Sequence, residues 1–406
     1  MKDRMRGGIK AQGRGTWVIV LSLGRDPTTG KYHQRWVSVK GTRKDAEAKR
    51  RELVHQLDCG DLIEPSKMTM ADFLLNRWLP NHAKNKNLAL RTVAGYRDRL
   101  ERHIIPALGH HHLSELKPVT VEAYYRQSME NGRLNGKGGL SARSVKQHHA
   151  ILHAALKDAV RWQMISRNPC DAVQPPVFHS PEMRTFDSDE IWRFLGVVKS
   201  DYPEYYALFY LLLFSGLRRS EALALTWRDL DLVDPHAGSL SVKRSLHCIK
   251  GEIHLSERTK TAKSNRTNGL PGTATLVLRE YREKRETIFQ DMGMSLVGDD
   301  LVFSRIDVLD QNGRPSAMLP DSVTHAWIKA VRRAGLPGVR LHDARHTHAS
   351  LMLDAGVDIS VIQKIEGHSS IRVTTDTYVH AVSALKRKAA QSFDERVSRP
   401  REVLNR

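Results

Sequence analysis

The sequence predicts a multidomain protein that is mainly α-helical and carries small β elements. The chain has 406 residues, which is more than one hydrophobic core commonly organises. Strand-forming residues gather near the N-terminus. Proline residues then mark a change at Glu64-Pro65-Ser66 and a connector at Asn168-Pro169 and Gln174-Pro175-Pro176. We therefore expect domains at residues 1–64, 65–176 and 177–390, with a basic tail at 391–406.

Charge is the most informative bulk property of the chain. Hydrophobic residues make up 40% and charged residues 27%, which is typical of a folded protein. The 64 Lys and Arg residues outnumber the 45 Asp and Glu residues, so the net charge is +19. This excess favours a polyanionic partner such as nucleic acid. A soluble protein that is merely basic is the alternative that charge alone leaves open.

Cysteine usage and the N-terminus indicate a reducing, cytoplasmic setting. Cys59, Cys170 and Cys248 lie far apart without a CxxC pair, which predicts neither a disulfide framework nor a thiolate metal site. The first ten residues lack the apolar segment of a signal peptide. The most apolar run, Tyr205 to Phe214, is about half as long as a membrane span requires. We interpret it as a buried helix and expect no membrane partner.

Residues 14–58 are predicted to form a small sheet followed by a helix. A β-rich run at 17–23 and an alternating run at 32–39 flank turn residues. Thr42 and Asp45 match a capping box for a helix through about residue 57.

The first 60 residues hold 14 Lys or Arg and 6 Asp or Glu. A compact basic sheet suggests strands that lie in a DNA groove, and a solvated charged face explains the same residues equally well.

The next segment has the patterns of four helices. They are expected at 70–79, 91–105, after Pro118, and at 141–162. Pro80 is expected to end the first helix, and Pro106 together with Gly109 the second, because proline cannot continue the hydrogen-bond ladder. In the fourth, apolar residues repeat with helical spacing, and His148 is assigned to the polar face.

From about residue 182 the pattern is that of a larger, mostly helical domain with a short β insert near 240–270. Beyond Ala381 the chain carries 7 Lys or Arg against 3 Asp or Glu, together with a few apolar residues. This composition suggests a docking helix and a basic tail.

Arg218 and Glu221 follow the apolar run and are expected on one face of the next helix, after a break at Gly216. A guanidinium held by a carboxylate is a preorganised anion clamp that suits a phosphate. An ordinary helix ion pair is the simpler interpretation of this segment taken alone.

A second cluster contains His342 and Arg345, which pair a proton-transfer group with another clamp. His342 and His346 also have the spacing of zinc ligands on a helix, and His348 could join them. The sequence lacks the HExxH glutamate, and Arg345 would repel a cation. We therefore expect no metal.

A third stretch places Gly367-His368 ahead of a Thr-rich segment that ends in Tyr378. A lone tyrosine is most often a packing residue, but Tyr378 stands downstream of two arginine-bearing segments and another histidine. Between those segments, the lysine-rich turn at 257–266 could bring an ammonium group to a leaving oxygen.

Together these motifs resemble the tyrosine recombinase (phage integrase) family. GLRRSEAL, LHDARHTHAS and EGHSSIRVTTDTYVH are similar to its three sequence boxes, and the resemblance is firmest from 205 to 381. One departure is Glu366, where family members commonly carry Leu. We expect this change to affect local packing and no catalytic role.

The resemblance also implies how the domains are built. Residues 14–58 look like the three-stranded domain that binds arm sites, and 68–175 like the helical, SAM-like domain that binds core sites. The remainder looks like the α+β catalytic domain of the family.

By resemblance, Tyr378 attacks the scissile phosphorus, forms a 3′-phosphotyrosyl link and frees a 5′-hydroxyl. Arg218 and Arg345 clamp the non-bridging oxygens. Lys260 protonates the leaving oxygen, with Lys263 as the rival because the register of the turn is open.

The resemblance assigns supporting roles to three further residues. His342 is the expected base for the tyrosine, and His368 a hydrogen-bond donor to the phosphate. Glu221 is expected to orient Arg218 rather than to react.

The resemblance implies no cofactor, because the phosphotyrosyl link conserves bond energy and guanidinium groups replace a metal. The expected partners are core and arm DNA attachment sites, a homotetramer that works through a Holliday junction, a directionality factor and a host DNA-bending protein. The expected task is integration or excision of a phage or mobile element. A type IB topoisomerase and a DNA-binding protein with vestigial catalytic residues are the alternatives.

Overall fold

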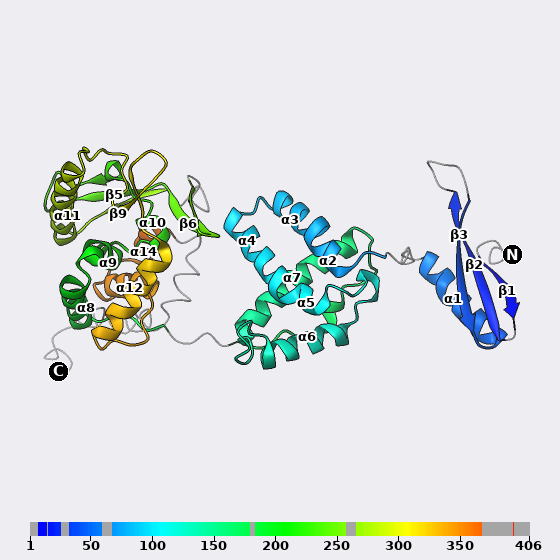
Figure 1. Ribbon diagram of the computed structural model, residues 1–406. Helices are drawn as coiled ribbons and strands as arrows, with labels where there is room; N and C mark the ends of the chain where they lie inside the picture. Colours follow the sequence, from blue (N-terminus) through cyan, green and yellow to red (C-terminus); the bar gives the residue numbers. More distant parts are fainter. Residues whose placement is uncertain are drawn as a thin grey trace, which may run out of the picture. The chain divides into compact units, whose positions relative to one another are not determined.

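The computed structural model describes residues 7–13, 15–25, 32–58, 67–178, 183–256, 265–367 and 393. The chain divides into two compact units, Met1–Ser180 and Pro181–Arg406. Helices dominate and the sheets are small, which confirms the predicted fold class (Figure 1). The domain boundaries expected at residues 64, 176 and 390 stay predictions. Among the described helices, none combines the length and apolar character that crossing a membrane requires.

The first part of the N-terminal unit is a three-stranded antiparallel sheet with one helix against it (Figure 1). Its elements are β1 (Gly7–Gly13), β2 (Thr16–Arg25), β3 (Tyr32–Lys40) and α1 (Arg43–Asp58). Ile19 and Leu21 of β2 pack against Leu53 and Val54 of α1. The sequence pattern anticipated β2, β3 and α1, whereas the glycine-containing β1 was expected only from the family resemblance.

The expected capping box at the start of α1 is confirmed. The backbone N–H of Thr42 donates to Asp45 Oδ2 at 2.8 Å, and the N–H of Asp45 donates to Thr42 Oγ1 at 3.3 Å. These bonds satisfy N–H groups that have no partner inside the helix.

The second part of this unit is helical and has its own hydrophobic core. Its elements are α2 (Met70–Asp72), η2 (Phe73–Trp78), α3 (Leu79–Asn85), α4 (Leu90–Arg99), η3 (Leu100–Ile104), α5 (Ile105–Leu108), η4 (Leu113–Glu115), α6 (Pro118–Asn131), α7 (Ala142–Arg161) and η5 (Pro169–Ala172). The helices expected after Pro118 and at 141–162 are confirmed as α6 and α7, and the structure shows that Ser141 caps α7.

The expectation that Pro80 and Pro106 end their helices is wrong, whereas Gly109 does end the second helix as expected. A π-helical segment precedes each proline, and the chain then continues as α3 and α5. The N–H of Leu79 bonds the carbonyl of Leu74, five residues back, and Ile105 bonds Leu100 in the same way. This wider turn accommodates a proline, whose ring otherwise clashes with the carbonyl four residues earlier.

The placement of His148 on a polar helix face is also wrong. Only 2% of His148 is exposed, and its Nδ1 lies 2.9 Å from the hydroxyl of Tyr124 on α6. Burial, followed by the charges of His103 and Arg99, lowers the pKa of His148 to about 4. The residue is thus a neutral core histidine with a satisfied hydrogen bond.

The C-terminal unit contains seven described α-helices around short strands. The helices are α8 (Ser188–Asp201), α9 (Pro203–Ser215), α10 (Arg219–Ala222), α11 (Gly272–Asp291), α12 (Pro320–Arg333), α13 (Asp343–Asp354) and α14 (Ile359–Glu366), with a 3-10 turn, η6 (Trp227–Asp229). The strands are β4 (Leu230–Asp231), β5 (Ser239–Val242), β6 (Ser245–Ile249), β7 (Glu252–Ser256), β8 (Arg266–Gly269), β9 (Ser304–Leu309) and β10 (Pro315–Ala317).

These strands form one sheet and two hairpins. The sheet has the order β4-β5-β8, while β6 pairs with β7 and β9 with β10. The insert expected near 240–270 is therefore confirmed. The sequence pattern did not anticipate β4, β9 or β10.

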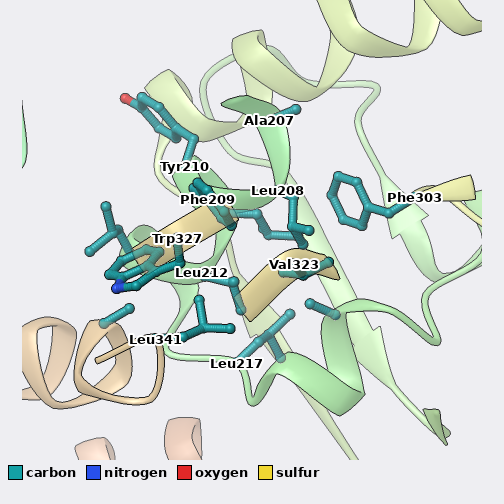
Figure 2. Close-up of a cluster of buried hydrophobic side chains, with 14 of the residues drawn as sticks. Ala207, Leu208, Phe209, Tyr210, Leu212, Leu217, Phe303, Val323, Trp327 and Leu341 are labelled. Carbon is teal, nitrogen blue, oxygen red and sulfur yellow. The ribbon is translucent and has the colours of Figure 1, made fainter. Parts of the chain in front are cut away.

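The apolar run is the buried helix that the sequence predicted. α9 lies at the centre of the core, in contact with α8, α11, α12 and α13. Trp327 of α12 is fully buried, with ring centroids 4.5 Å from Phe194 and 5.1 Å from Phe209. Figure 2 shows Trp327 and Phe209 among the leucines of this cluster. The core positions the end of α9 and the start of α13. These two helices carry residues of the candidate site.

Replacing the central aromatic ring should loosen this unit. Trp327→Ala leaves a large cavity and is expected to cost about 3–5 kcal/mol. Hydrogen exchange followed by mass spectrometry should report lost protection in α8, α9 and α12. The matched control is Ile328→Ala on the same helix, where the side chain is 38% exposed and the cost should stay near 0.5 kcal/mol or below. Equal effects of the two variants would contradict this account of the core.

Candidate active site

The first predicted clamp is formed by Arg218 and Glu221. Arg218 immediately precedes α10, and Glu221 lies in its first turn. Glu221 Oε1 accepts from Arg218 Nη1 at 2.6 Å, and its Oε2 accepts from the backbone N–H of Arg218 at 3.0 Å. One carboxylate thus fixes both the backbone and the guanidinium of Arg218. A third of the Arg218 side chain (34%) stays exposed, while Glu221 is buried.

Arg345, the second predicted clamp, is held by backbone carbonyls and a carboxylate. It lies on the first turn of α13 and is 1% exposed. Its Nη1 donates to the carbonyl of Gly216 at 2.7 Å, and its Nη2 donates to the carbonyl of Glu366. Its Nε also faces Glu366 Oε2 at 3.5 Å. The guanidinium therefore joins the end of α9 to the end of α14.

A third arginine, Arg266 of β8, completes the cluster. Its Nη2 donates to Glu221 Oε2 at 2.8 Å, and its Nε donates to the carbonyl of Ile365 at 2.6 Å. Asn268 on the same strand donates to this carbonyl at 2.9 Å. Glu221 consequently lies between two guanidinium groups, and β8 is tied to the last turn of α14.

Two glycines turn the helix ends toward these arginines. Gly216 ends α9 with φ +64°, and Gly367 ends α14 with φ +60°, both in the left-handed region that favours glycine. The carbonyls of Gly216, Glu366 and Gly367 accept from Arg345 or Arg218. The C-terminal end of a helix carries partial negative charge, so cations are stabilised there.

The charges of the cluster persist at neutral pH. Burial raises the pKa of Glu221, but the hydrogen bond and charge of Arg266 and the charge of Arg218 outweigh it and hold this pKa at about 2. Burial lowers the pKa of Arg345 to about 10, and the charge of Glu366 opposes that shift. The site is thus a fixed array of guanidinium groups and carboxylates.

His342 lies beside this array, directly before α13. Its ring is 5.0 Å from that of His346 in an edge-to-face arrangement. Partial burial, followed by the charges of His346, Arg345 and Arg218, lowers the pKa of His342 to about 4, although the residue as a whole is exposed to solvent. An imidazole of this kind is neutral at pH 7 and can accept a proton.

The described part of the site does not resemble a metal centre. Within the described ranges, no group of three or more His, Cys, Asp or Glu is arranged to hold a metal ion. His346 and His348 instead lie among charged groups of the protein, with His348 Nδ1 3.9 Å from Glu366 Oε1.

Three of the six predicted catalytic residues, Arg218, His342 and Arg345, belong to this cluster. The other three, Lys260, His368 and Tyr378, lie outside the described residues, as does the rival Lys263.

Arg266 and Glu366 are the members of the cluster that sequence reasoning missed. Arg266 ends the lysine-rich turn, but its partner Glu221 is 45 positions away in the chain. Glu366 stood out only as a departure from the family pattern, with an expected effect on packing. Its carboxylate lies 3.5 Å from Arg345 Nε, a contact that the sequence did not predict.

Two family models match the chain. The family model described as "Phage integrase family" matches residues 184–384, and that described as "Phage integrase, N-terminal SAM-like domain" matches residues 72–129. The chain belongs to the phage integrase family. As a member of this family, it is a tyrosine-type site-specific DNA recombinase.

Relatives of this integrase span nearly its whole length. A "Tyrosine recombinase XerC-like" protein of Caldanaerobacter subterraneus subsp. tengcongensis is 24% identical over 400 residues, which cover 94% of this chain and 97% of the relative.

Solved structures show the same fold. The integrase of transposon Tn1549 in complex with transposon right end DNA matches with a TM-score of 0.61 and 21% identity, over 81% of this chain and 99% of that one. A lambda integrase tetramer bound to a Holliday junction matches with a TM-score of 0.54 and 17% identity, over 89% and 95% of the two chains.

Gly216 should be irreplaceable for two separate reasons. A Cβ at this position would lie 2.6 Å from His348 Nδ1, and φ is positive. Gly356 has φ +83° and open space around an added Cβ, with nothing within 4 Å, so it isolates the backbone effect. In hydrogen exchange, Gly356→Ala should cost about 1–2 kcal/mol. Gly216→Ala should cost a further 1–3 kcal/mol or so from overpacking. Equal losses would mean that the contact with His348 is unimportant.

The imidazole of His342 should titrate well below the usual range. Its pKa is lowered to about 4, so the ring should remain neutral as the pH falls through 6.5 and gain its proton only near pH 4. Ring resonances followed by NMR from pH 8 to 4 will test this, with His342→Gln identifying the signal. A midpoint near 6.5 would contradict the influence of burial and the neighbouring cations.

Proposed function

We propose that this integrase cleaves and rejoins DNA through a covalent 3′-phosphotyrosyl intermediate, with Tyr378 as the nucleophile. The observation that carries the proposal is the convergence of Arg218 and Arg345 on the ends of α9 and α14, each in contact with a carboxylate. Two fixed guanidinium groups side by side suit the charge that a phosphodiester develops during transfer.

The chemistry of phosphodiesters explains why these groups are needed. The phosphodiester is anionic and its alkoxide leaving group is poor, so cleavage requires charge stabilisation, a nucleophile and a general acid. Arg218 and Arg345 neutralise the non-bridging oxygens. Only 1% of Arg345 is exposed, so its contact with the phosphate requires rearrangement of surrounding segments on binding.

Proton transfer completes the proposed reaction. His342, which is neutral at pH 7, accepts the proton of Tyr378, and Glu221 orients Arg218. Lys260, or Lys263 on the same turn, protonates the leaving 5′-oxygen, and His368 hydrogen-bonds the phosphate. A 5′-hydroxyl of the partner duplex then attacks the phosphotyrosine and restores the diester. Bond energy is conserved, so the reaction requires neither ATP nor a cofactor.

The DNA partners follow from the domain arrangement. We propose that the helical segment within 65–176 binds core sites and that the N-terminal sheet binds arm sites. Support for the latter comes from the exposed face of β3, where Trp36 is 60% exposed and the ammonium group of Lys10 lies 5.5 Å from its ring centroid. Aromatic and basic side chains on an open sheet suit a DNA groove.

The lambda integrase complex with a Holliday junction is tetrameric, and we propose the same assembly here. Two rounds of strand exchange on paired sites would integrate or excise a phage or mobile element in the bacterial cytoplasm. A directionality factor and a DNA-bending protein are the proposed accessory partners. Relaxation of supercoiled DNA that lacks any attachment site would favour the topoisomerase alternative instead.

The covalent step can be tested with a nicked suicide duplex that carries the site protected by the purified chain. The wild-type protein should accumulate a protein–DNA adduct that survives denaturation, because the released fragment diffuses away and prevents religation. Tyr378→Phe should bind the duplex but form no adduct. Tyr206→Phe, on half-buried α9 surface, is the matched control and should retain the adduct. An equal adduct with Tyr378→Phe would refute the assignment, and no adduct with wild type would refute the enzymatic proposal.

A further inference from the structure

We propose that Glu366 is a positioning residue for strand cleavage: its enclosed carboxylate holds the Arg345 guanidinium in the orientation that binds the scissile phosphate. The inference rests on the proposed function, since Arg345 matters here as a phosphate clamp. It assigns a role to the position at which the chain departs from the common family pattern.

The first argument is the double contact between the two residues. Glu366 is 0% exposed and lies at the last position of α14, while Arg345 lies on the first turn of α13. The carboxylate of Glu366 faces Arg345 Nε at 3.5 Å, and its backbone carbonyl accepts from Arg345 Nη2. One residue therefore fixes the guanidinium from two directions.

The second argument is the number of donors that remain. A guanidinium has five N–H groups. One N–H of Nη1 donates to the carbonyl of Gly216, and one N–H of Nη2 donates to the carbonyl of Glu366. The Nε–H faces the carboxylate of Glu366. These contacts, which involve only described residues, leave one N–H on each terminal nitrogen of Arg345. Two such donors are what bidentate contact with a phosphate requires.

The third argument is energetic. A guanidinium with 1% exposure is unfavourable without a nearby opposite charge. Burial lowers the pKa of Arg345 and the charge of Glu366 raises it, so the carboxylate helps to keep the clamp protonated. A leucine side chain at this position would supply neither the charge nor an acceptor.

The surroundings of Glu366 indicate that it acts through Arg345. Its Oε1 lies 3.9 Å from His348 Nδ1, and a Cβ at Gly216 would stand 3.2 Å from the same oxygen. The carboxylate is thus enclosed by protein on both sides. Glu221 lies in the same way beside Arg218, so each clamping arginine faces a buried carboxylate.

Single-turnover cleavage of the suicide duplex provides the first test. Glu366→Gln removes the charge and keeps the shape, and Glu366→Leu removes both charge and acceptor. Each should slow cleavage on the order of tenfold or more, while the dissociation constant for DNA stays within about twofold. Glu366→Asp keeps the charge and should retain more activity than either. Glu286→Gln removes a surface partner of Arg282 and should leave the rate unchanged.

A double-mutant cycle separates positioning from general support of the fold. In an Arg345→Lys background, Glu366→Gln should cause little further loss, because the group that it positions is already gone. Losses that multiply, or a Glu366→Leu protein that cleaves as fast as wild type, would overturn the proposal. Thermal unfolding of each variant will show which of them remain folded.

A readout without catalysis keeps this inference distinct from the proposed function. In protein labelled with ¹⁵N-arginine, the Nε–H of Arg345, identified with Arg345→Lys, should be protected from exchange. Glu366→Leu, which removes both the charge and the acceptor, should weaken this protection, and Glu286→Gln should not. If wild type forms no covalent adduct, the proposed function fails while this signal still decides the positioning role. Unchanged protection in Glu366→Leu would overturn it.

Discussion

The structure of the site depends on one constraint: a buried guanidinium must have its charge and its donors satisfied by the surrounding protein. Arg345 meets this constraint with the carbonyls at the ends of α9 and α14 and with the carboxylate of Glu366. Because those two helix ends are far apart in sequence, their contact with a single side chain ties the centre of the core to the last described helix. Arg266 repeats this link from β8 through Glu221 and Ile365.

The fold could be predicted well where local pattern and burial agree. The apolar residues of α9 and the capping box before α1 are visible in the sequence because each depends on near neighbours. Prediction failed where the structure overrides a local rule. The helices continue past Pro80 and Pro106 through π-helical turns, and the neighbouring sequence does not specify that geometry.

The same distinction applies to the candidate site. Spacing could place Arg218 next to Glu221, because the two residues are three positions apart. It could not place Arg266 on the other side of Glu221 or Glu366 beside Arg345, because those contacts depend on the tertiary packing of β8 and α14. His148 shows the reverse case: a residue assigned to solvent is buried since α6 covers that face of α7. The assignment of Tyr378 as the nucleophile rests on the family resemblance alone.

The acceptors that hold the arginines include four backbone carbonyls, those of Gly216, Ile365, Glu366 and Gly367. A carbonyl is the same whatever side chain its residue carries, so these bonds place no demand on amino-acid identity at position 365. The two left-handed glycines are different, because their conformation excludes most side chains. Substitutions in this part of the chain should accordingly be tolerated unevenly. Positions that contribute only a backbone carbonyl should accept many residue types, whereas the two glycines that orient those carbonyls should accept almost none.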